Sequence, residues 1–423
     1  MNEKRTKLLR MGIALSILTS TLLHATNGDN LIAVGTKSRG MGGAGIGVSH
    51  CAESTLQNPA LITCTKGTSI SFGGTIFMPD INANMGAANS HGSAADMNII
   101  PGVVISHKLD DNWYLGIGMW GTAGMGVDYR DIQQTATDSG NMHMVTNLQL
   151  MQFGASLAYS QDNFGVAVTP VVQYGALDIN YQGFDGSNVG DGVAQDLGFG
   201  VNLGAYYDLK NGVTLGAVYK SEIDMEYKNQ LSTATKPFAD IDIFPTAMDD
   251  HLEQPAEIGV GIGYKTGQHT LAFDYKQIKW SDAKGYKDFG WKDQDVYALG
   301  YQYTQDKWRA RAGYNHASQP ISEAQSGPAV IAPGSYAQAG GNALNLFNLL
   351  GFPATAEDHY TIGGGYEFSD NFYVDLAYVY APETSTTMKT ITGMDGAGNI
   401  HTGDSTVKHG ESSLSFQLSY RFF

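Results

Sequence analysis

The sequence predicts an all-β protein, a 14-stranded antiparallel transmembrane β-barrel with an N-terminal plug (hatch) inside the lumen. Three observations predict this fold. Apolar side chains alternate with small or polar ones from Thr68 to the C-terminus, which is the period of 2 that strands require. The connections between the alternating segments are short and long in turn. The segment before them is too rich in Gly for a helix and too broken for a strand.

Fourteen segments carry the alternation, an even number as in closed bacterial barrels. They are residues 68–78, 97–108, 113–128, 147–159, 164–180, 197–207, 213–227, 254–265, 269–280, 294–304, 308–316, 360–367, 372–381 and 411–423. Because a closed barrel satisfies every backbone polar group in lipid, we expect the apolar face to point outward and the polar face inward. Inward charges can then pair with plug charges such as Arg39 and Glu53. These inward charges are Lys220, Glu222, Asp224, Arg309 and Arg311.

The connections distinguish a membrane barrel from a soluble sandwich. The short ones consist of turn residues and lie at 109–112, 160–163, 208–212, 266–268, 305–307 and 369–371. The long ones lie near 79–96, 129–146, 181–196, 228–253, 281–293, 317–359 and 382–410. Outer-membrane barrels have short periplasmic turns and long external loops, whereas a sandwich has no reason to sort its loops. An aromatic residue follows four short turns, at Trp113, Phe164, Trp308 and Phe372, as expected for an interfacial girdle.

The N-terminus predicts export. Residues 1–25 have a basic start, an apolar core of 13 residues and a plausible cleavage site before Thr26, which is typical of a signal peptide. That core is too short for a spanning helix. We therefore divide the chain into a signal peptide (1–25), a plug (26–66) and an outer-membrane β-barrel (67–423). The formal charge of −16 argues against nucleic acid as a partner, because the phosphates would be repelled.

The plug carries two recognisable stretches, the Gly-rich run from Arg39 to Gly47, which includes Gly42 and Gly43, and the tripeptide Asn58-Pro59-Ala60. Glycines allow a segment to take positive φ and to pass close to other backbone, as threading through a barrel requires. Residues 40–45 also fit the dinucleotide motif G-x-G-x-x-G, but neither a preceding strand nor a following helix is indicated. A flexible linker is the other alternative, although the stretch is more apolar than a typical linker.

The only two cysteines, Cys51 and Cys64, both lie in the plug. A cysteine pair in an exported protein predicts a disulfide. A metal site is not expected, because His50 would be a third ligand and nothing nearby clearly supplies a fourth. We expect no cofactor.

Several stretches together resemble the outer-membrane long-chain fatty-acid transporter family and its relatives that carry aromatic hydrocarbons (FadL/TodX-like). They are residues 26–30, 38–43, 58–60, 280–281, 290–293 and 297–300. The resemblance implies the plugged barrel, ligand capture by external loops, and an inner site contacted by Thr26 and Asn27. It also implies sideways release where the third strand kinks, here at Gly121, Gly124 and Gly126.

The resemblance has one departure. Fatty-acid members place basic residues near the ligand carboxylate, and Lys287 falls where one is expected. On the fifth strand, however, Tyr174-Gly175-Ala176 stands where an Arg is expected, which leaves room for neutral hydrocarbons. Apolar loop residues form the expected capture surface, namely Phe238, Phe244, Met248 and, within the helix-forming stretch 343–350, Phe347.

These observations predict passive uptake of hydrophobic small molecules, long-chain fatty acids or aromatic hydrocarbons, across the bacterial outer membrane. A general polar porin is the alternative, followed by a barrel lipid hydrolase. The sequence has no G-x-S-x-G, H-E-x-x-H or phosphate-loop motif, so we expect neither an enzyme nor an energy-driven pump. The expected partners are the ligand, outer-membrane lipids and lipopolysaccharide, and the barrel-assembly machinery acting through the C-terminal strand, with the protein a monomer.

Overall fold

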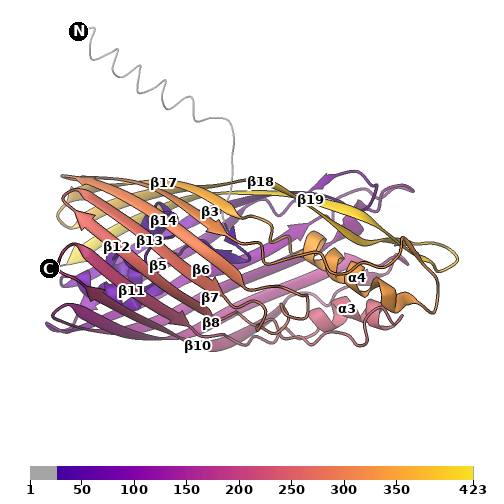
Figure 1. The fold of residues 1–423 in the computed structure, drawn as a ribbon, viewed down its shortest axis with the longest axis horizontal. Helices are drawn as coiled ribbons and strands as arrows, with labels where there is room; N and C mark the ends of the chain where they lie inside the picture. The colour runs from indigo at the N-terminus through magenta and orange to yellow at the C-terminus, as the bar shows by residue number, and fades with distance from the viewer. Residues whose placement is uncertain (1–25, 423) are drawn as a thin grey trace, which may run out of the picture.

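The computed structural model describes residues 26–422, so the predicted signal peptide (1–25) and Phe423 lie outside the described residues. One antiparallel sheet of nineteen strands closes on itself through pairing of β19 with β3. Five of these strands are two residues long, which leaves fourteen that build the wall among the described residues (Figure 1). The predicted 14-stranded barrel is confirmed.

The wall strands follow the chain order. They are β3 (Thr68–Asn84), β5 (Asn98–Lys108), β6 (Trp113–Asp128), β7 (Val145–Gln161), β8 (Phe164–Gln182), β10 (Ala194–Asp208), β11 (Val213–Lys220), β12 (Glu257–Thr266), β13 (His269–Ile278), β14 (Gln294–Gln305), β15 (Trp308–Ala317), β17 (Asp358–Ser369), β18 (Phe372–Met394) and β19 (Ile400–Phe422). The short strands are β1 (Thr26–Asn27), β2 (Asn30–Leu31), β4 (His91–Gly92), β9 (Asn188–Val189) and β16 (Val330–Ile331).

Several strand boundaries differ clearly from the prediction, and β3, predicted to end at residue 78, continues to Asn84. β11 ends at Lys220, so Glu222 and Asp224 lie beyond the wall and not on its inward face. The predicted loop 382–410 is wrong for most of its length, because β18 and β19 continue through it as a hairpin that projects past the barrel (Figure 1). Its Thr-rich sequence favours strand, but it lacks the apolar alternation by which lipid-spanning strands are recognised.

The two ends of the barrel differ. The short turns and the C-terminus lie at one end, and the long loops with helices α3 (Leu231–Ala239) and α4 (Gly340–Leu346) lie at the other (Figure 1). A π-helical turn, η5 (Phe347–Gly351), follows α4. The long loops also contain two 3₁₀ turns, η3 (Gly140–His143) and η4 (Tyr336–Ala339). Between residues 26 and 422, no helix has the length and apolarity needed to cross a membrane.

The outer face of the wall is apolar, as predicted. On β19, Leu414 and Phe416 are exposed, whereas Ser413 and Ser415 between them are fully buried. Exposed aromatic rings gather near the short turns, where Trp308 lies 4.4 Å from Tyr366 between ring centroids. The alternation of apolar and polar side chains along the strands therefore gives the wall an outward face that suits lipid and an inward face that suits a polar plug.

The plug is built from α2 (Thr36–Arg39) and two 3₁₀ turns, η1 (Cys51–Leu56) and η2 (Pro59–Cys64). It appears in indigo among the strands in Figure 1, and most of its residues are buried. The predicted disulfide joins Cys51 to Cys64, with the Cα atoms 5.5 Å apart, and thereby ties η1 to η2.

Candidate functional site

The Gly-rich run of the plug contacts the wall backbone to backbone. Gly42 has a φ of +68°, and a Cβ there would lie 2.6 Å from the carbonyl oxygen of Tyr314 and 2.7 Å from that of Leu299. The Gly42 N–H donates to Thr361 Oγ1 at 2.9 Å. Only glycine combines this backbone conformation with so close an approach. The run is therefore seated against β14, β15 and β17.

A wall carboxylate holds the next turn of the plug. Asp274 Oδ2 on β13 accepts hydrogen bonds from the backbone N–H groups of Gly45 at 2.7 Å and Ile46 at 2.8 Å. Asn58 links two parts of the plug, because its Nδ2 donates to the carbonyl oxygen of Ile46 at 2.8 Å. The same Nδ2 also links the plug to the wall, since it donates to the carbonyl oxygen of Ala205 on β10 at 3.0 Å. Its Oδ1 also accepts from the N–H that follows Pro59, capping η2.

The charged residues of the plug find different partners from those we predicted. Glu53 pairs with Lys37 of the plug itself at 2.6 Å. Arg39 donates to Ser413 on β19 at 2.9 Å, and burial lowers its pKa to about 10, so it stays protonated at neutral pH. Of the inward charges, Arg311 pairs with buried Asp375 at 2.7 Å.

The wall has a gap beside the plug. β5 and β6 pair only where Gly102–Lys108 faces Tyr114–Trp120. Beyond Trp120, β6 continues to Asp128 paired with β7, with a register shift between Gly121 and Ala123. Its other edge pairs with the plug instead, through Asn30 of β2 opposite Ala123. We call the opening between β5 and this part of β6 the gap.

Backbone hydrogen bonds to β6 close the gap at both of its ends. The Gly124 N–H donates to the Asp29 carbonyl oxygen at 3.0 Å, so the leader (residues 26–34) lies across it. At the far end the Ala94 N–H donates to the Asp128 carbonyl oxygen at 2.8 Å. The three predicted kink glycines all lie along this edge. A Cβ on Gly121 would overlap Ile100, and one on Gly126 would overlap the Thr146 carbonyl oxygen.

A cavity of about 620 Å³ occupies the gap; we call it the gap cavity. Its lining reaches from Thr26 and Leu31 of the leader to Ile99 at the outer surface, which is 77% exposed. Most lining side chains are apolar. They include Phe77, Ile81, Met97, Ile100, Met125, Val127, Leu148, Leu150 and Met151. The cavity therefore connects the barrel interior with the lipid-facing surface.

Of the two predicted inner-site residues, Thr26 lies at the inner end of this cavity. The Thr26 hydroxyl, which lines it, donates to the carboxylate of Glu411 on β19. Asn27 is fully buried beside it. The Asp29 carboxylate accepts from the Tyr286 hydroxyl, and burial raises the pKa of Asp29 to about 7. The structure thus places Thr26 at the inner end of the gap cavity and Asn27 next to it but outside the lining, and contact of either residue with ligand stays a prediction.

An aromatic group covers the leader from the loop after β13. The ring centroids of Trp280 and Tyr286 are 4.6 Å apart, and Trp291 lies 5.1 Å from Trp280 and 4.8 Å from Tyr286. Trp280 also contacts the leader, since a Cβ on Gly28 would lie 2.9 Å from its ring. This loop therefore holds the leader in the gap.

The predicted capture residues form a closed cluster rather than an exposed surface. Phe238 packs against Phe244 and Phe347, with centroids 5.8 and 5.3 Å apart, and Met248 is partly buried against the same cluster. Lys287 is exposed and lines none of the three cavities described here. The structure therefore does not bring Lys287 together with the other predicted site residues, and its role stays a prediction.

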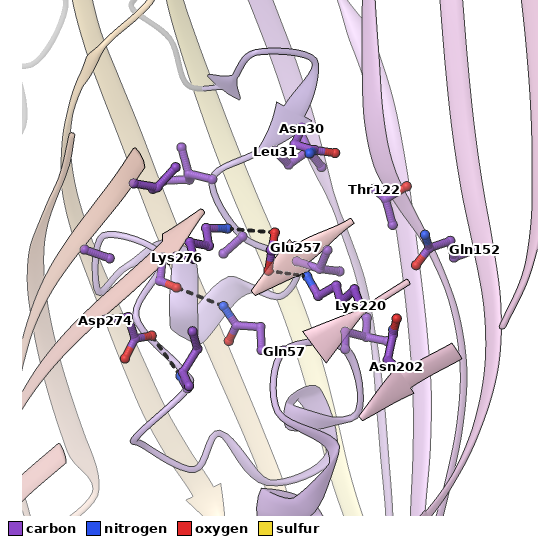
Figure 2. Close-up of a pocket in the computed structure, with 18 of the residues that line it drawn as sticks. Asn30, Leu31, Gln57, Thr122, Gln152, Asn202, Lys220, Glu257, Asp274 and Lys276 are labelled. Carbon is purple, nitrogen blue, oxygen red and sulfur yellow. Dashed lines mark hydrogen bonds and ion pairs between the residues drawn. The ribbon is translucent and has the colours of Figure 1, made fainter. Parts of the chain in front are cut away.

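A second cavity, of about 70 Å³, lies between plug and wall; we call it the chamber (Figure 2). Glu257 of β12 stands between two lysines there, 2.9 Å from Lys220 Nζ and 3.4 Å from Lys276 Nζ. Asp274 and Gln254 also line it. A smaller cavity of about 50 Å³, the middle cavity, lies between the chamber and the gap cavity and shares lining residues with both.

Sequence reasoning missed three parts of this site. The pairing of Asn30 with β6 has no local signal, because a two-residue strand carries no periodicity. Asp29 and the chamber residues Glu257 and Lys276 were also missed. The alternation of side chains along β12 and β13 could have identified Glu257 and Lys276, since both occupy positions that face the lumen.

Comparison with known proteins agrees with this architecture. The sequence matches the family described as "Outer membrane protein transport protein (OMPP1/FadL/TodX)" over residues 23–332. It is 24% identical over 439 residues to outer membrane protein P1 of Haemophilus influenzae, covering 86% of this chain and 89% of the relative.

Solved structures show the same fold. A FadL homologue of Pseudomonas aeruginosa superposes with a TM-score of 0.68 at 15% identity, covering 94% of this chain and all of that one. The toluene transporter TodX of Pseudomonas putida gives 0.64 at 16%, covering 92% and 99%. With the family match spanning most of its length, this chain belongs to the OMPP1/FadL/TodX family of outer-membrane transport proteins.

Proposed function

We propose that this protein carries hydrophobic small molecules passively across the outer membrane and releases them sideways through the gap between β5 and β6. The gap cavity is the observation that carries the proposal. It runs from the leader inside the barrel to Ile99 on the outer surface, and its lining is mostly apolar. An apolar molecule that leaves by this route passes into lipid without crossing water, so no energy source is needed.

The lining favours neutral cargo over carboxylates. The one cation that lines the gap cavity, among the described residues, is Arg130, and it is ion-paired with Asp128. Glu411 lies at the inner end and would repel an anion. We therefore propose that the preferred cargo is an aromatic or other neutral hydrocarbon and not a fatty acid. The solved relatives include proteins named as toluene transporters and as a monoaromatic hydrocarbon channel, which supports this choice.

We propose that capture begins at the external loops. The cluster of Phe238, Phe244 and Phe347 closes that end of the barrel, so cargo can enter only when these rings separate. Met248, partly buried at the edge of the cluster, adapts readily to different shapes because its side chain is unbranched and flexible.

The remaining predicted partners fit the surface. The outward apolar side chains suit contact with outer-membrane lipids and lipopolysaccharide, and pairing of β19 with β3 closes the wall within one chain. We propose a monomer inserted by the barrel-assembly machinery through its C-terminal strand. Membership of a transport family agrees with the prediction that the chain is not an enzyme.

A cross-link across the gap tests the sideways route. Asn30 and Ala123 are cross-strand partners, so the variant Asn30→Cys/Ala123→Cys joins the leader to β6. We expect uptake of radiolabelled toluene by cells to fall at least about tenfold, because the leader can no longer leave the gap. The matched control is Leu215→Cys/Ile262→Cys, an exposed pair of cross-strand partners on β11 and β12.

Uptake by the cross-linked variant at the control rate would contradict release through the gap. Single-channel recording tests the polar porin separately. The plug occupies the lumen, so we expect no large steady conductance, and observing one would favour the porin.

A further inference from the structure

The chamber gathers polar atoms that lack partners. Five buried side-chain atoms in its lining have no hydrogen-bond partner among residues 26–422. They are Gln57 Oε1, Trp120 Nε1, Thr122 Oγ1, Gln254 Oε1 and Asp274 Oδ1. Trp120, Asp274 and Gln254 expose only 1%, 3% and 8% of their surface. Buried polar atoms in folded proteins are almost always hydrogen-bonded, to ordered water where protein groups cannot reach.

The chamber has the size and charge that water requires. At roughly 10–15 Å³ for each water, its 70 Å³ accommodates about five to seven molecules. Donors and acceptors are both present, since Trp120 Nε1 donates and Gln254 Oε1 accepts. The Lys220–Glu257–Lys276 group lies along the same wall, as Figure 2 shows, and charged groups are costly to strip of water.

The chamber adjoins the proposed exit route. The middle cavity shares Leu31, Ile100 and Gly121 with the gap cavity, and it shares Leu31 and Trp120 with the chamber. A molecule in the gap cavity therefore has two neighbouring regions that it could enter. One is the lipid, past Ile99, and the other is the chamber, which lies behind the side chains of Leu31 and Trp120.

We propose that the chamber is a site for ordered water that excludes apolar molecules, and that it turns cargo at Leu31 and Trp120 toward the gap. An apolar molecule in the chamber would displace waters without replacing their hydrogen bonds, whereas the gap cavity offers apolar contacts. The sorting role rests on the proposed function. The occupancy of the chamber by water is independent of the proposed function.

Crystals of the purified protein soaked with bromobenzene test this inference. In the wild type we expect ordered waters within hydrogen-bond distance of Trp120 Nε1 and Gln254 Oε1, and no anomalous bromine peak in the chamber. In Lys220→Met/Glu257→Leu/Lys276→Met, which removes the three charges together, we expect a bromine peak to appear there. The control Lys389→Met/Asp404→Leu removes an exposed ion pair on the outer hairpin and should leave the chamber unchanged.

A second variant keeps the test decisive if the triple variant does not fold. Trp120→Phe retains most of the ring but removes the donor, so one ordered water should be lost while the chamber still excludes bromobenzene. A bromine peak in the wild-type chamber, or a chamber without ordered water, would overturn the inference. A missing bromine peak in the gap cavity would count against the proposed function alone.

Discussion

On the side that faces β13 to β17 the Gly-rich run of the plug touches the wall backbone to backbone, whereas on the side that faces the part of β6 beyond Trp120 the leader borders the gap cavity. On the first side, Gly42 is enclosed by the backbone of β14 and β15, and Asp274 binds two plug N–H groups. On the second side, the leader makes a single cross-strand pair with β6, at Asn30 and Ala123.

This difference shows which part of the plug can move. Close backbone contact and direct hydrogen bonds leave no low-energy alternative position, because shifting the plug would break many of them at once. A leader held by one strand pair and a few side chains can separate at far smaller cost. The Gly-rich run is therefore fixed against the wall, and the passage forms beside the leader.

The largest expected effect is on the fixed side. Gly42→Ala adds a Cβ against three backbone atoms of the wall at a positive φ, so we expect it to destabilise the barrel by about 4 kcal/mol or more. The matched control is Gly267→Ala, which has a φ of +55° but nothing within 4 Å of its Cβ. Thermal unfolding followed by gel mobility measures both. Equal stability of the two variants would mean that the plug is not fixed there.

A buried ion pair gives the next effect on the same side. Arg311→Met removes the cation closest to buried Asp375 and leaves Lys37, 3.8 Å away, and Arg309 as its positive neighbours, and we expect a loss of about 3 kcal/mol. Lys236→Met breaks an exposed pair with Asp240 and should cost less than about 1 kcal/mol. Denaturant unfolding in detergent compares them. A loss at Arg311 no larger than at Lys236 would contradict the structure.

At the gap, a rise in pH should weaken the docking of the leader against the wall. Because burial raises the pKa of Asp29 from 3.8 to about 7, the folded state favours the protonated carboxyl. Docking of the leader is then strongest below pH 4, weakens as the pH rises toward 7, and changes little above 7. Hydrogen exchange of residues 26–31, corrected for its intrinsic pH dependence, should show this trend.

The control for that trend is Asp29→Asn, which stays neutral at every pH and should remove the dependence. Asp282→Asn, at an exposed loop position, should preserve it. A wild-type leader equally protected at pH 4 and pH 8 would show that Asp29 does not hold it.

The smallest effect is expected at Lys287. Its side chain is exposed, so Lys287→Met should change the affinity for palmitate less than about fivefold, as an exposed charge pair contributes at most about 1 kcal/mol. Calorimetry with palmitate and with toluene separates charge from apolar contact. A larger loss confined to palmitate would place Lys287 at the ligand, as the sequence predicted, and would favour a fatty acid.

Much of the wall was predictable because its signals are local. β6 was predicted to the residue, since turn residues precede Trp113 and the alternation ends at Asp128. The extended β18–β19 hairpin was missed because strand pairing outside lipid does not require an apolar face. The cluster around Phe347 was expected at the surface but is buried, because several separate loops converge on it.

The sequence by itself determined the strand number, the sorting of the loops, the disulfide and the segment that fills the lumen, because each depends on neighbouring residues or on alternation. Only the tertiary structure decided which flank of the plug is fixed, where the wall opens, and which polar atoms share the chamber. These features join Asn30 to Ala123 and Trp120 to Asp274, residues far apart in the chain whose meeting depends on how the closed barrel places them around its plug.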